Sequence, residues 1–402
     1  MDALTTPLPK AWQKVRLGDV AEIIGGGTPS TQITSFWNGS INWFTPTEIG
    51  ITKYVYKSQR TITPLGLKKS SAKLLPIGTI LLTSRASIGD CAILKVVATT
   101  NQGFQSLIPL EKINNEFLYY LMLTLKNKLL KLASGSTFLE VSPNKIKNLL
   151  IPLPPLNEQI AIANILSDLD HYLYSLRALI LKKESVKKAL SFELLSQRKR
   201  LKGFNQNWQR VRLGTYKYRR GSFPQPYGNP QWYSDNGMPF VQVYDVGENF
   251  KLTQKTKQKI SKIAQPMSVF VPKNSVIITL QGTIGRVALT QYDCYCDRTI
   301  LIFDNNTLND VNKYFFVLSL FTKFEEEKRK ADGSIIKTIT KQTLKDFEIL
   351  LPPLNEQIAI ADILSGLDHE IISLKNKKRQ FDNIKKALNH DLMSAKIRVL
   401  NK

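Results

Sequence analysis

The chain has 402 residues, 43% of them hydrophobic, which provides for two domains with proper cores and excludes general disorder. Lysine and arginine number 56 against 32 aspartate and glutamate, a formal net charge of +24, and both halves of the chain carry the excess. A folded basic protein is typical of a polyanion binder, because neutralised phosphates release condensed counterions, although solubility alone also explains a basic surface.

Targeting and redox signals are absent from the sequence. No apolar segment approaches the ~20 residues that span a bilayer, and the start at Met1 lacks the basic and apolar regions of a signal peptide. We therefore expect a cytoplasmic protein without membrane contact. The three cysteines, Cys91, Cys294 and Cys296, are too few for a disulfide framework and form no Cys-x-x-Cys pair, so we expect ordinary thiols and no metal site.

In chain order, the first element is an opening segment that recurs in the second half. Trp-Gln-Lys-Val-Arg-Leu-Gly at residues 12–18 corresponds to Trp-Gln-Arg-Val-Arg-Leu-Gly at residues 208–214. A repeat of about two hundred residues is far too long for a solenoid unit, so each half should contain a complete domain and a connecting element. The interiors have diverged almost everywhere. We expect the shared frame to bind one kind of partner twice, while the two interiors recognise different things.

The sequence of the diverged interiors predicts mixed α/β domains that are rich in β-strands. Residues 78–84 and 275–280 are short, rich in β-branched residues and bounded by glycine or polar residues, which predicts strands. Residues 41–50 and 238–247 form another matched pair. There the first copy presents Thr45 and Thr47 and the second Gln242 and Tyr244, as reading of base edges by equivalent strands would require. Drift of polar loop residues would look the same.

Further candidates for DNA contact are basic and hydrogen-bonding residues near predicted loops. Arginine pairs with guanine and glutamine with adenine, whereas serine, threonine and lysine mostly hold phosphates. Each of these residues could equally be an ordinary solvated side chain. With the four residues above, the candidates are Thr28, Ser30, Arg85, Gln102, Ser136 and Lys145 in the first half and Arg219, Arg220, Arg298, Ser334 and Lys337 in the second.

Each interior ends at a proline-rich junction. Pro-Pro-Leu-Asn-Glu-Gln-Ile-Ala-Ile-Ala occurs at residues 154–163 and again, identically, at residues 352–361. Pro152 and the prolines of both junctions cannot extend a strand but suit the first turn of a helix, so they mark a domain boundary. We interpret the identical residues as a docking surface for a partner present in two copies, although recent gene duplication also explains them. The residues concerned are Leu156, Asn157, Glu158, Gln159 and Ile160, with Leu354, Asn355, Glu356, Gln357 and Ile358.

The segments after the junctions predict two long amphipathic helices. Apolar residues recur at the a and d positions of a heptad, with polar interruptions at Lys183 and Lys187 in the first copy and Lys378 and Lys385 in the second. Roughly 40 residues give a helix of about 60 Å. Because neither apolar stripe is stable in water, the two helices should pair as an antiparallel coiled coil. Two ordinary helices, each lying on its own domain, are the alternative. The apolar positions are Leu166, Leu169, Leu173, Leu176, Ile180, Leu190 and Leu194, and Leu364, Leu367, Ile371, Leu374, Phe381, Leu388 and Leu392.

No catalytic motif accompanies these elements. The run Gly25-Gly26-Gly27-Thr28 lacks the spacing of a dinucleotide loop, and the absence of any Gly-Lys pair excludes a Walker A loop. The only histidines, His171, His369 and His390, form no metal-ligand cluster and should be exposed or capping residues of the helices. We expect a non-catalytic chain that binds no cofactor itself.

The predicted fold class is α+β, with an internal pseudo-two-fold repeat in which two α/β domains alternate with two long helices. The predicted regions are 1–151 and 201–350 for the two domains, and 152–200 and 351–402 for the helical regions. Together with the repeated openings, the junctions and the C-terminal Leu-Met-Ser-Ala-Lys-Ile-Arg-Val at residues 392–399, this organisation resembles the specificity subunit of type I restriction-modification systems over the whole length of the chain.

The resemblance implies a specific function. Each variable domain would be a target recognition domain that reads one half of a split, asymmetric site on double-stranded DNA, with the coiled coil as the spacer. Two methyltransferase subunits, which bind S-adenosylmethionine and methylate adenine N6, would dock on the conserved regions. Restriction and translocase subunits, which use ATP and magnesium, would join them. The rival functions are a self-contained methyltransferase or nuclease and an architectural DNA binder without a partner enzyme.

Overall fold

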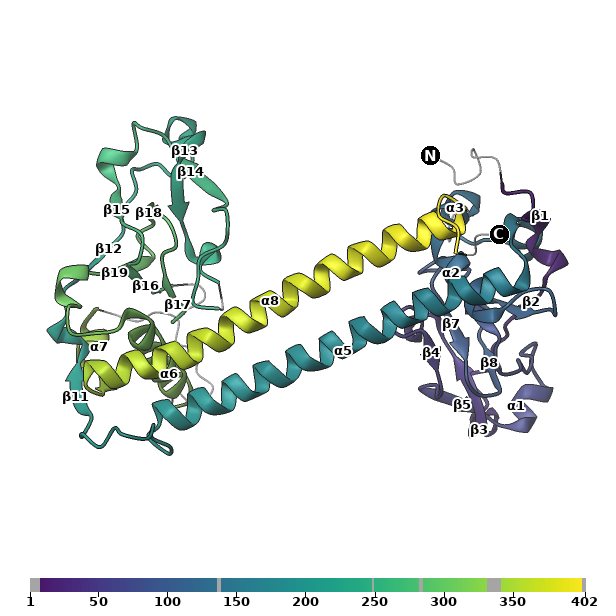
Figure 1. Ribbon diagram of the computed structural model, residues 1–402, viewed down its shortest axis with the longest axis horizontal. Coiled ribbons are helices and arrows are strands. Elements are labelled where there is room, and N and C mark those ends of the chain that lie inside the picture. Colours follow the sequence, from purple (N-terminus) through teal and green to yellow (C-terminus); the bar gives the residue numbers. More distant parts are fainter. Residues whose placement is uncertain (1–7, 136–138, 248, 282–284, 331–340, 400–402) are drawn as a thin grey trace. The chain divides into compact units, whose positions relative to one another are not determined.

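The computed structural model describes residues 8–135, 139–247, 249–281, 285–330 and 341–399. The chain divides into two compact units, the first formed by residues 1–178 and 375–402 and the second by residues 179–374. Each unit contains one sheet domain and part of each of two long helices, α5 (Leu156–Leu195) and α8 (Leu354–Met393) (Figure 1).

Within its described residues, the sheet domain of the first unit has three sheets. They have the strand orders β2-β9-β6-β7-β4, β5-β3-β8 and β1-β10. Its strands are β1 (Gln13–Arg16), β2 (Ala21–Gly25), β3 (Trp37–Phe44), β4 (Tyr54–Val55), β5 (Arg60–Ile62), β6 (Ile80–Leu82), β7 (Cys91–Leu94), β8 (Ala98–Thr100), β9 (Gln105–Pro109) and β10 (Leu150–Leu153). Its helices are α1 (Pro64–Lys68), α2 (Asn115–Thr124), α3 (Lys126–Leu132) and α4 (Pro143–Lys147).

The sheet domain of the second unit repeats this plan. Its sheets have the strand orders β12-β19-β16-β17, β14-β13-β18-β15 and β11-β20. The strands are β11 (Gln209–Arg212), β12 (Tyr218–Arg220), β13 (Tyr233–Val241), β14 (Gln258–Ile260), β15 (Val269–Val271), β16 (Val276–Thr279), β17 (Val287–Leu289), β18 (Cys294–Cys296), β19 (Ile300–Phe303) and β20 (Glu348–Leu351). The helices are α6 (Lys313–Lys330) and α7 (Lys341–Asp346).

The central strands are apolar on both faces because both faces are buried. In β6, Ile80 and Leu82 pack into a core that also contains residues of α2, whereas Leu81 points into a separate core on the other face. In β16, Ile278 and Ile277 divide between two cores in the same way. This explains why these strands appear in the sequence as short continuous apolar runs, and it confirms both strand predictions.

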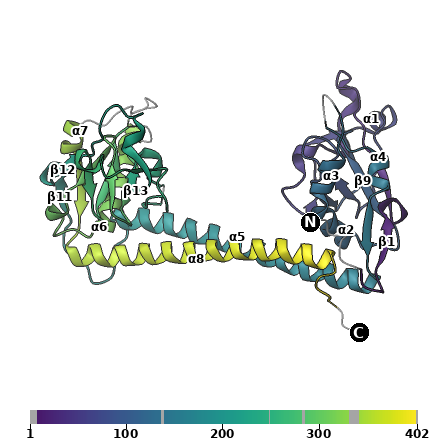
Figure 2. The same cartoon turned by 90° about the horizontal axis from the view of Figure 1, so that it is seen from above.

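The two long helices are antiparallel, as predicted. In the first unit the ring of Tyr172 on α5 lies 4.7 Å from that of Phe381 on α8, measured between centroids. In the second unit Lys187 of α5 pairs with Asp368 of α8 at 2.5 Å. Residue numbers therefore rise along one helix as they fall along the other. Within each unit the helices pack against each other and against the sheet domain, as Figure 2 shows for α2 beside the helix pair.

The predicted polar interruptions of the heptads carry ion pairs between the helices. Lys183 pairs with Glu370 at 2.8 Å in the second unit, and Lys385 pairs with Asp170 in the first. Lys378 instead pairs with Asp382 of its own helix. Charged residues at such inward positions lower stability relative to apolar ones but specify the alignment of the two helices.

Two details of the sequence interpretation are wrong. Pro152 was expected to end a strand, but it lies within β10, opposite Lys14 of β1. Both strands of this two-stranded sheet are edge strands, and an edge strand tolerates a proline, which has no N–H to donate. Thr45 and Thr47 lie after β3 rather than on it, Thr45 as the N-cap of the 3₁₀ turn Pro46–Glu48 and Thr47 within that turn.

The predicted boundaries at 151/152 and 350/351 fall inside β10 and β20, and the predicted division into regions stays a prediction.

Candidate nucleic-acid interface

A short turn after β8 organises the candidate residues of the first unit. The backbone N–H of Asn101 donates to the carbonyl of Phe44 at the end of β3, at 3.0 Å. The carbonyl of Gly103 accepts from the N–H of Ser84, beyond β6, at 2.8 Å. The side chain of Asn101 accepts from the N–H of Gly103 and closes the turn at 2.8 Å. The turn is therefore fixed on both sides, with the exposed side chain of Gln102 at its tip.

The loop after β2 lies directly against this turn. A Cβ atom on Gly26 would lie 1.8 Å from the carbonyl oxygen of Asn101, so only glycine permits this approach. Two residues later the hydroxyl of Thr28 donates to the side-chain oxygen of Gln102. The loop thereby holds Gln102 in one orientation.

Two tryptophans hold the same loop in place. The indole N–H of Trp43 donates to the carbonyl of Gly27 at 2.8 Å, and that of Trp37 donates to the carbonyl of Ser30 at 3.0 Å. Both rings are buried and meet edge to face at 5.0 Å. The guanidinium of Arg60 stacks 3.7 Å above the ring of Trp37. A rigid loop loses little conformational entropy when it binds a ligand.

The 3₁₀ turn after β3 places Thr45 and Thr47 beside the same site. The backbone N–H and the hydroxyl of Thr45 both donate to Glu48, at 2.7 and 2.8 Å, so the Glu48 carboxylate closes the turn onto its N-cap residue. Thr47 is exposed. The side chain of Pro46 lies close to Gly103, which brings the two turns together.

Arg85 and Lys145 are the other described DNA-contact candidates of the first unit. Arg85 pairs with Glu140 at 2.8 Å, and the backbones of Glu140 and Ser134 form a bridge. The ammonium of Lys145 donates to the hydroxyl of Ser134 at 3.0 Å and to the carbonyl of Leu132 at 2.9 Å. The described candidates of the first unit are therefore linked through neighbouring contacts. Ser136 lies outside the described residues.

The turn after β18 in the second unit has the same framework. The N–H of Asp297 donates to the carbonyl of Val241 at the end of β13 at 3.0 Å, and the carbonyl of Thr299 accepts from the N–H of Leu280 at 2.8 Å. A Cβ atom on Gly221, after β12, would lie 2.2 Å from the carbonyl of Cys296. Arg298 occupies the exposed tip, the position of Gln102 in the first unit.

The loop after β12 also holds the residue at the tip of its turn. The hydroxyl of Tyr227 donates to the carboxylate of Asp297, and the guanidinium of Arg298 lies 5.2 Å from the centroid of the Tyr227 ring. Trp232 and Tyr233 bind this loop, donating to the carbonyls of Pro226 and Tyr227 at 3.1 and 2.8 Å respectively. The aromatic anchors of the first unit thus have counterparts in the second.

Gln242 and Tyr244 lie in the second unit's counterpart of the Thr45 turn. The N–H of Gln242 donates to Asp245 at 2.9 Å, and the hydroxyl of Tyr244 donates to the side-chain oxygen of Gln242. Burial raises the pKa of Asp245, and backbone hydrogen bonds from Gln242 and Lys257 oppose that shift. Tyr244 is exposed, and the ammonium of Lys257 lies 5.1 Å from its ring centroid.

The remaining candidates of the second unit lie on β12 or outside the described residues. Arg219 donates to the carbonyl of Phe270 at 3.0 Å and lines a pocket with Lys217 and Asn305. Arg220, at the end of β12, is exposed. Ser334 and Lys337 lie outside the described residues.

The repeated junctions contain a buried polar cluster in each unit. In the first unit Glu158 accepts from the indole of Trp12 at 3.0 Å and from Arg398 at 2.8 Å. In the second unit Glu356 accepts from Trp208 at 3.2 Å and from Arg200 at 2.6 Å. Both carboxylates are almost fully buried. Their identity in the two copies is therefore explained by contacts within the chain.

The neighbouring glutamines are buried as well. The side-chain oxygen of Gln159 accepts from the N–H of Asn114 at the start of α2, at 2.8 Å, and its nitrogen donates to the carbonyl of Pro154. Gln357 binds the N–H of Asn312 in the same way at 3.0 Å. Glu158, Gln159, Glu356 and Gln357 thus cannot present their side chains to a partner, contrary to our interpretation. The other six junction candidates, Leu156, Asn157, Ile160, Leu354, Asn355 and Ile358, are exposed.

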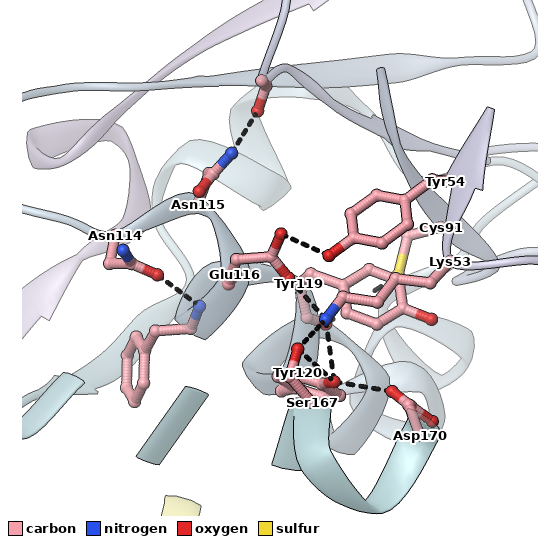
Figure 3. Close-up of polar contacts among 12 residues, drawn as sticks. Lys53, Tyr54, Cys91, Asn114, Asn115, Glu116, Tyr119, Tyr120, Ser167 and Asp170 are labelled. Carbon is pink, nitrogen blue, oxygen red and sulfur yellow. Dashed lines mark hydrogen bonds and ion pairs between the residues drawn. The ribbon is translucent and has the colours of Figure 1, made fainter. Parts of the chain in front are cut away.

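A second polar cluster joins the first sheet domain to the helices (Figure 3). The ammonium of Lys53 lies 2.5 Å from Glu116, 2.7 Å from the hydroxyl of Ser167 and 2.8 Å from that of Tyr120. Tyr120 donates to Asp170 of α5 at 2.6 Å. Burial lowers the pKa of Lys53, although Glu116 opposes the shift, and burial raises the pKa of Tyr120.

The second unit contains a corresponding contact. The hydroxyl of Tyr314 on α6 donates to Asp368, the counterpart of Asp170, which also pairs with Lys187. Burial raises the pKa of Tyr314, with a further contribution from its hydrogen bond to Asp368. In each unit, therefore, a tyrosine of the sheet domain binds an aspartate that pairs across the two helices.

Comparison with known proteins identifies the chain's family. A family model described as the type I restriction modification DNA specificity domain matches residues 9–184 and 205–381. The chain belongs to this family. The MjaIX specificity subunit of Methanocaldococcus jannaschii is 28% identical across 98% of this chain and 95% of its own length. The EcoR124I/EcoR124II specificity subunit of Escherichia coli is 36% identical, over 38% of this chain and 40% of its own length.

Solved structures support the same fold for this specificity subunit. The S subunit of a type I restriction-modification system from M. genitalium superposes with a TM-score of 0.60 at 16% identity, covering 97% of this chain and 98% of its own. A chain from a study of complex assembly in the type I restriction-modification system superposes with a TM-score of 0.64 at 21% identity, covering 96% and 99%. The predicted α+β repeat with two long helices is confirmed.

The specificity subunit is a non-catalytic DNA-recognition component with two target recognition domains. Several residues that shape these domains were not among the predicted candidates, notably Trp37, Trp43, Tyr227 and Asn101. Their signal was weak, because an aromatic residue or an asparagine near a strand end is most often a core or turn residue. Only the fold shows that these side chains bind the loops that carry the candidates.

The three cysteines and two of the histidines of the specificity subunit lie as the sequence predicts. Cys91, Cys294 and Cys296 are buried free thiols, and burial raises the pKa of Cys91 to about 12. His171 and His369 are exposed on the helices. Within the described ranges no group of three or more His, Cys, Asp or Glu residues could hold a metal ion. None of the helices in the described part of the chain is long and apolar enough to cross a membrane.

Proposed function

We propose that this chain reads a split, asymmetric site on double-stranded DNA, with one target recognition domain on each half-site. The observation that carries the proposal is the pair of matching turns after β8 and β18, which have the same backbone hydrogen bonds but different exposed side chains. One backbone framework that carries two different sets of exposed side chains recognises two different DNA sequences. A homodimeric DNA-binding protein would instead require a palindromic site. The net charge of +24 supplies the attraction to phosphates.

The candidates divide by chemistry into two roles. Gln102, Gln242, Tyr244 and Arg298 have side chains that suit base edges. Thr28, Ser30, Thr45, Thr47, Arg85, Lys145, Arg219 and Arg220 suit contacts to phosphates or support of the reading loops, as do Ser136, Ser334 and Lys337. The helix pair α5 and α8 sets the spacer between the half-sites. Removing whole heptads from both helices should change the spacer and leave the half-site sequences intact.

The proposal includes two methyltransferase subunits that dock on the repeated junctions. The support is the equal exposure of apolar side chains in both copies, with Leu156 and Leu354 exposed by 47% and 41% and Ile160 and Ile358 each by 42%. The partners would bind S-adenosylmethionine and methylate adenine N6. Restriction and translocase subunits with ATP and magnesium would join them for cleavage in the cytoplasm.

Docking is tested by stoichiometry. The single variants Ile160→Asp and Ile358→Asp should each lose one of two methyltransferase subunits, and the double variant should lose both, when complexes are weighed by native mass spectrometry. His171→Asp, an exposed change farther along α5, is the matched control and should retain two. Two bound subunits on the double variant would place docking elsewhere.

The DNA-reading function is tested by mapping methylated adenines in a methylation-free host. The host expresses this chain with its methyltransferase subunit, beside controls that express each alone. Methylation in one split, asymmetric motif, present only when both proteins are expressed, is the expected result. Absence of any motif, with the methyltransferase active through another specificity subunit, would contradict the proposed function. Methylation by this chain alone would make it an enzyme in its own right.

A further inference from the structure

The tips of the two matching turns are structurally equivalent positions. In each unit the residue before the tip donates its N–H to the last residue of the neighbouring parallel strand, at 3.0 Å in both cases. In each unit the residue after the tip accepts from the segment beyond the central strand, at 2.8 Å in both cases. Gln102 and Arg298 therefore extend from the same place on the same framework.

The side chain at each tip is also oriented by the same neighbouring loop. In the first domain Thr28 donates to the side-chain oxygen of Gln102. In the second domain Tyr227, fixed by its bond to Asp297, provides the ring over which Arg298 lies. The loops themselves are anchored by aromatic side chains and by a close glycine approach. An exposed long side chain that is held in this way is preorganised for a specific contact.

The chemistry of the two side chains predicts what each one contacts. The Gln102 amide combines an NH2 group that donates with an oxygen that accepts, the pattern that matches N7 and N6 of adenine, and the oxygen bound by Thr28 can accept a second hydrogen bond. The guanidinium of Arg298 offers paired donors, which match O6 and N7 of guanine. Since the positions are equivalent, the difference lies in the side chain rather than in the framework.

We propose that Gln102 and Arg298 are equivalent specificity-determining residues, each reading one base pair of its own half-site, adenine by Gln102 and guanine by Arg298. This assignment rests on the proposed function. It goes further by naming one position per domain that sets one base independently of the rest of the half-site. A bidentate contact discriminates against the wrong base by roughly 5- to 150-fold.

The test exchanges the two side chains between the domains. The motif of the parental chain, co-expressed with its methyltransferase subunit in a methylation-free host, is mapped first; absence of a split motif there refutes the proposed function itself. Gln102→Arg should then change one adenine of one half-site to guanine, and Arg298→Gln should change one guanine of the other half-site to adenine. Lys68→Gln, on the exposed surface of α1, is the matched control and should leave the motif unchanged.

An unaltered motif in both exchange variants would overturn the assignment, as would simultaneous changes at several positions of a half-site. A variant that gives no methylation is assayed as the purified complex on four duplexes that differ only at the mapped base. A preference shifted by roughly 5-fold or more toward the new base supports the proposal. Retention of the parental preference, or equal loss on all four duplexes, assigns the residue to the phosphate backbone or the fold and overturns it.

Thr28→Ala provides an independent check on orientation. It leaves the Gln102 amide in place and removes the hydroxyl that holds it. Discrimination at the adenine position should fall several-fold, while discrimination at the other bases of that half-site stays the same. Unchanged discrimination would show that Thr28 does not position Gln102.

Discussion

In the first recognition domain the turn after β8 carries Gln102 and lies beside a triple-glycine loop; in the second the turn after β18 carries Arg298 and lies beside a loop with Tyr227. The backbone hydrogen bonds that fix the two turns join equivalent positions and have equal lengths, 3.0 Å before the tip and 2.8 Å after it. In these turns, therefore, the same backbone framework exposes different side chains.

At the repeated junctions, unlike at the turns, the buried side chains are identical in the two copies. Glu158 and Glu356 each accept from a tryptophan that begins a domain and from an arginine that follows a long helix. A buried carboxylate with three donors tolerates little substitution, because any loss leaves a charge or a donor without its partner. The same physics keeps the two copies identical there and allows them to differ at the turns.

The largest effect is expected from breaking a junction. Glu158→Ala should lower the free energy of unfolding by about 3 kcal/mol, because it leaves the Arg398 guanidinium and the Trp12 indole without their acceptor. Glu356→Ala should have a similar effect through Arg200 and Trp208. Chemical denaturation measures both, and Glu158→Gln, which keeps an acceptor oxygen, should lose less. A loss well below 1 kcal/mol for both alanine variants would mean that the junctions do not stabilise the domains.

The next effect concerns the ion pairs between α5 and α8. Asp368→Ala should cost about 2 kcal/mol, since Lys187 and the Tyr314 hydroxyl both lose their partner in a largely buried site. Replacing the pair together, Lys187→Met with Asp368→Leu, should restore most of that loss. Denaturant unfolding of the three proteins gives the comparison. A double variant as unstable as Asp368→Ala would show that the tyrosine contact, rather than the ion pair, is the source of stability.

A smaller effect should distinguish the loop anchors of the two domains. Trp43→Phe removes a buried hydrogen bond to the carbonyl of Gly27 and should lower stability by about 1 kcal/mol. Trp232→Phe removes the bond to the carbonyl of Pro226 from a more exposed ring and should lower it less. Each change should weaken discrimination only in its own half-site, which methylation mapping of both variants would check. Weakened discrimination in both half-sites would contradict independent reading by the two domains.

The helices and their pairing could be predicted from the sequence because heptads of apolar residues repeat over many turns. The burial of the junction residues could also have been found. Glu158, Gln159, Ile162, Ala163 and Leu166 fall at the spacing of one helix face, and that face is buried. Reading the identical residues as a surface overlooked this periodicity, and the second copy, with Glu356 and Gln357, repeats it.

The partners of those residues could not be predicted. Arg398 lies 240 residues from Glu158 in the sequence, and Gln102 lies 74 residues from Thr28. No local pattern marks either contact, because sheet and helix packing bring the residues together. The sequence therefore indicated polar residues of the right kinds but could not show which turn places Gln102 and Arg298 in equivalent positions.

The smallest effect expected is a pH dependence from the polar cluster around Lys53 in the first unit, where the lysine ammonium donates to the hydroxyl of Tyr120. The folded pKa of Lys53 is lowered by burial, so the folded chain loses this proton at a lower pH than the unfolded chain, whose lysine pKa is about 10.4. Stability should therefore rise as pH increases through that window, relative to a Lys53→Met variant. Glu116→Gln removes a carboxylate that opposes the shift, so the rise should begin at lower pH. Denaturant unfolding between about pH 8 and pH 10 measures the difference, and parallel profiles for the wild type and Lys53→Met would show that burial does not affect the charge of Lys53.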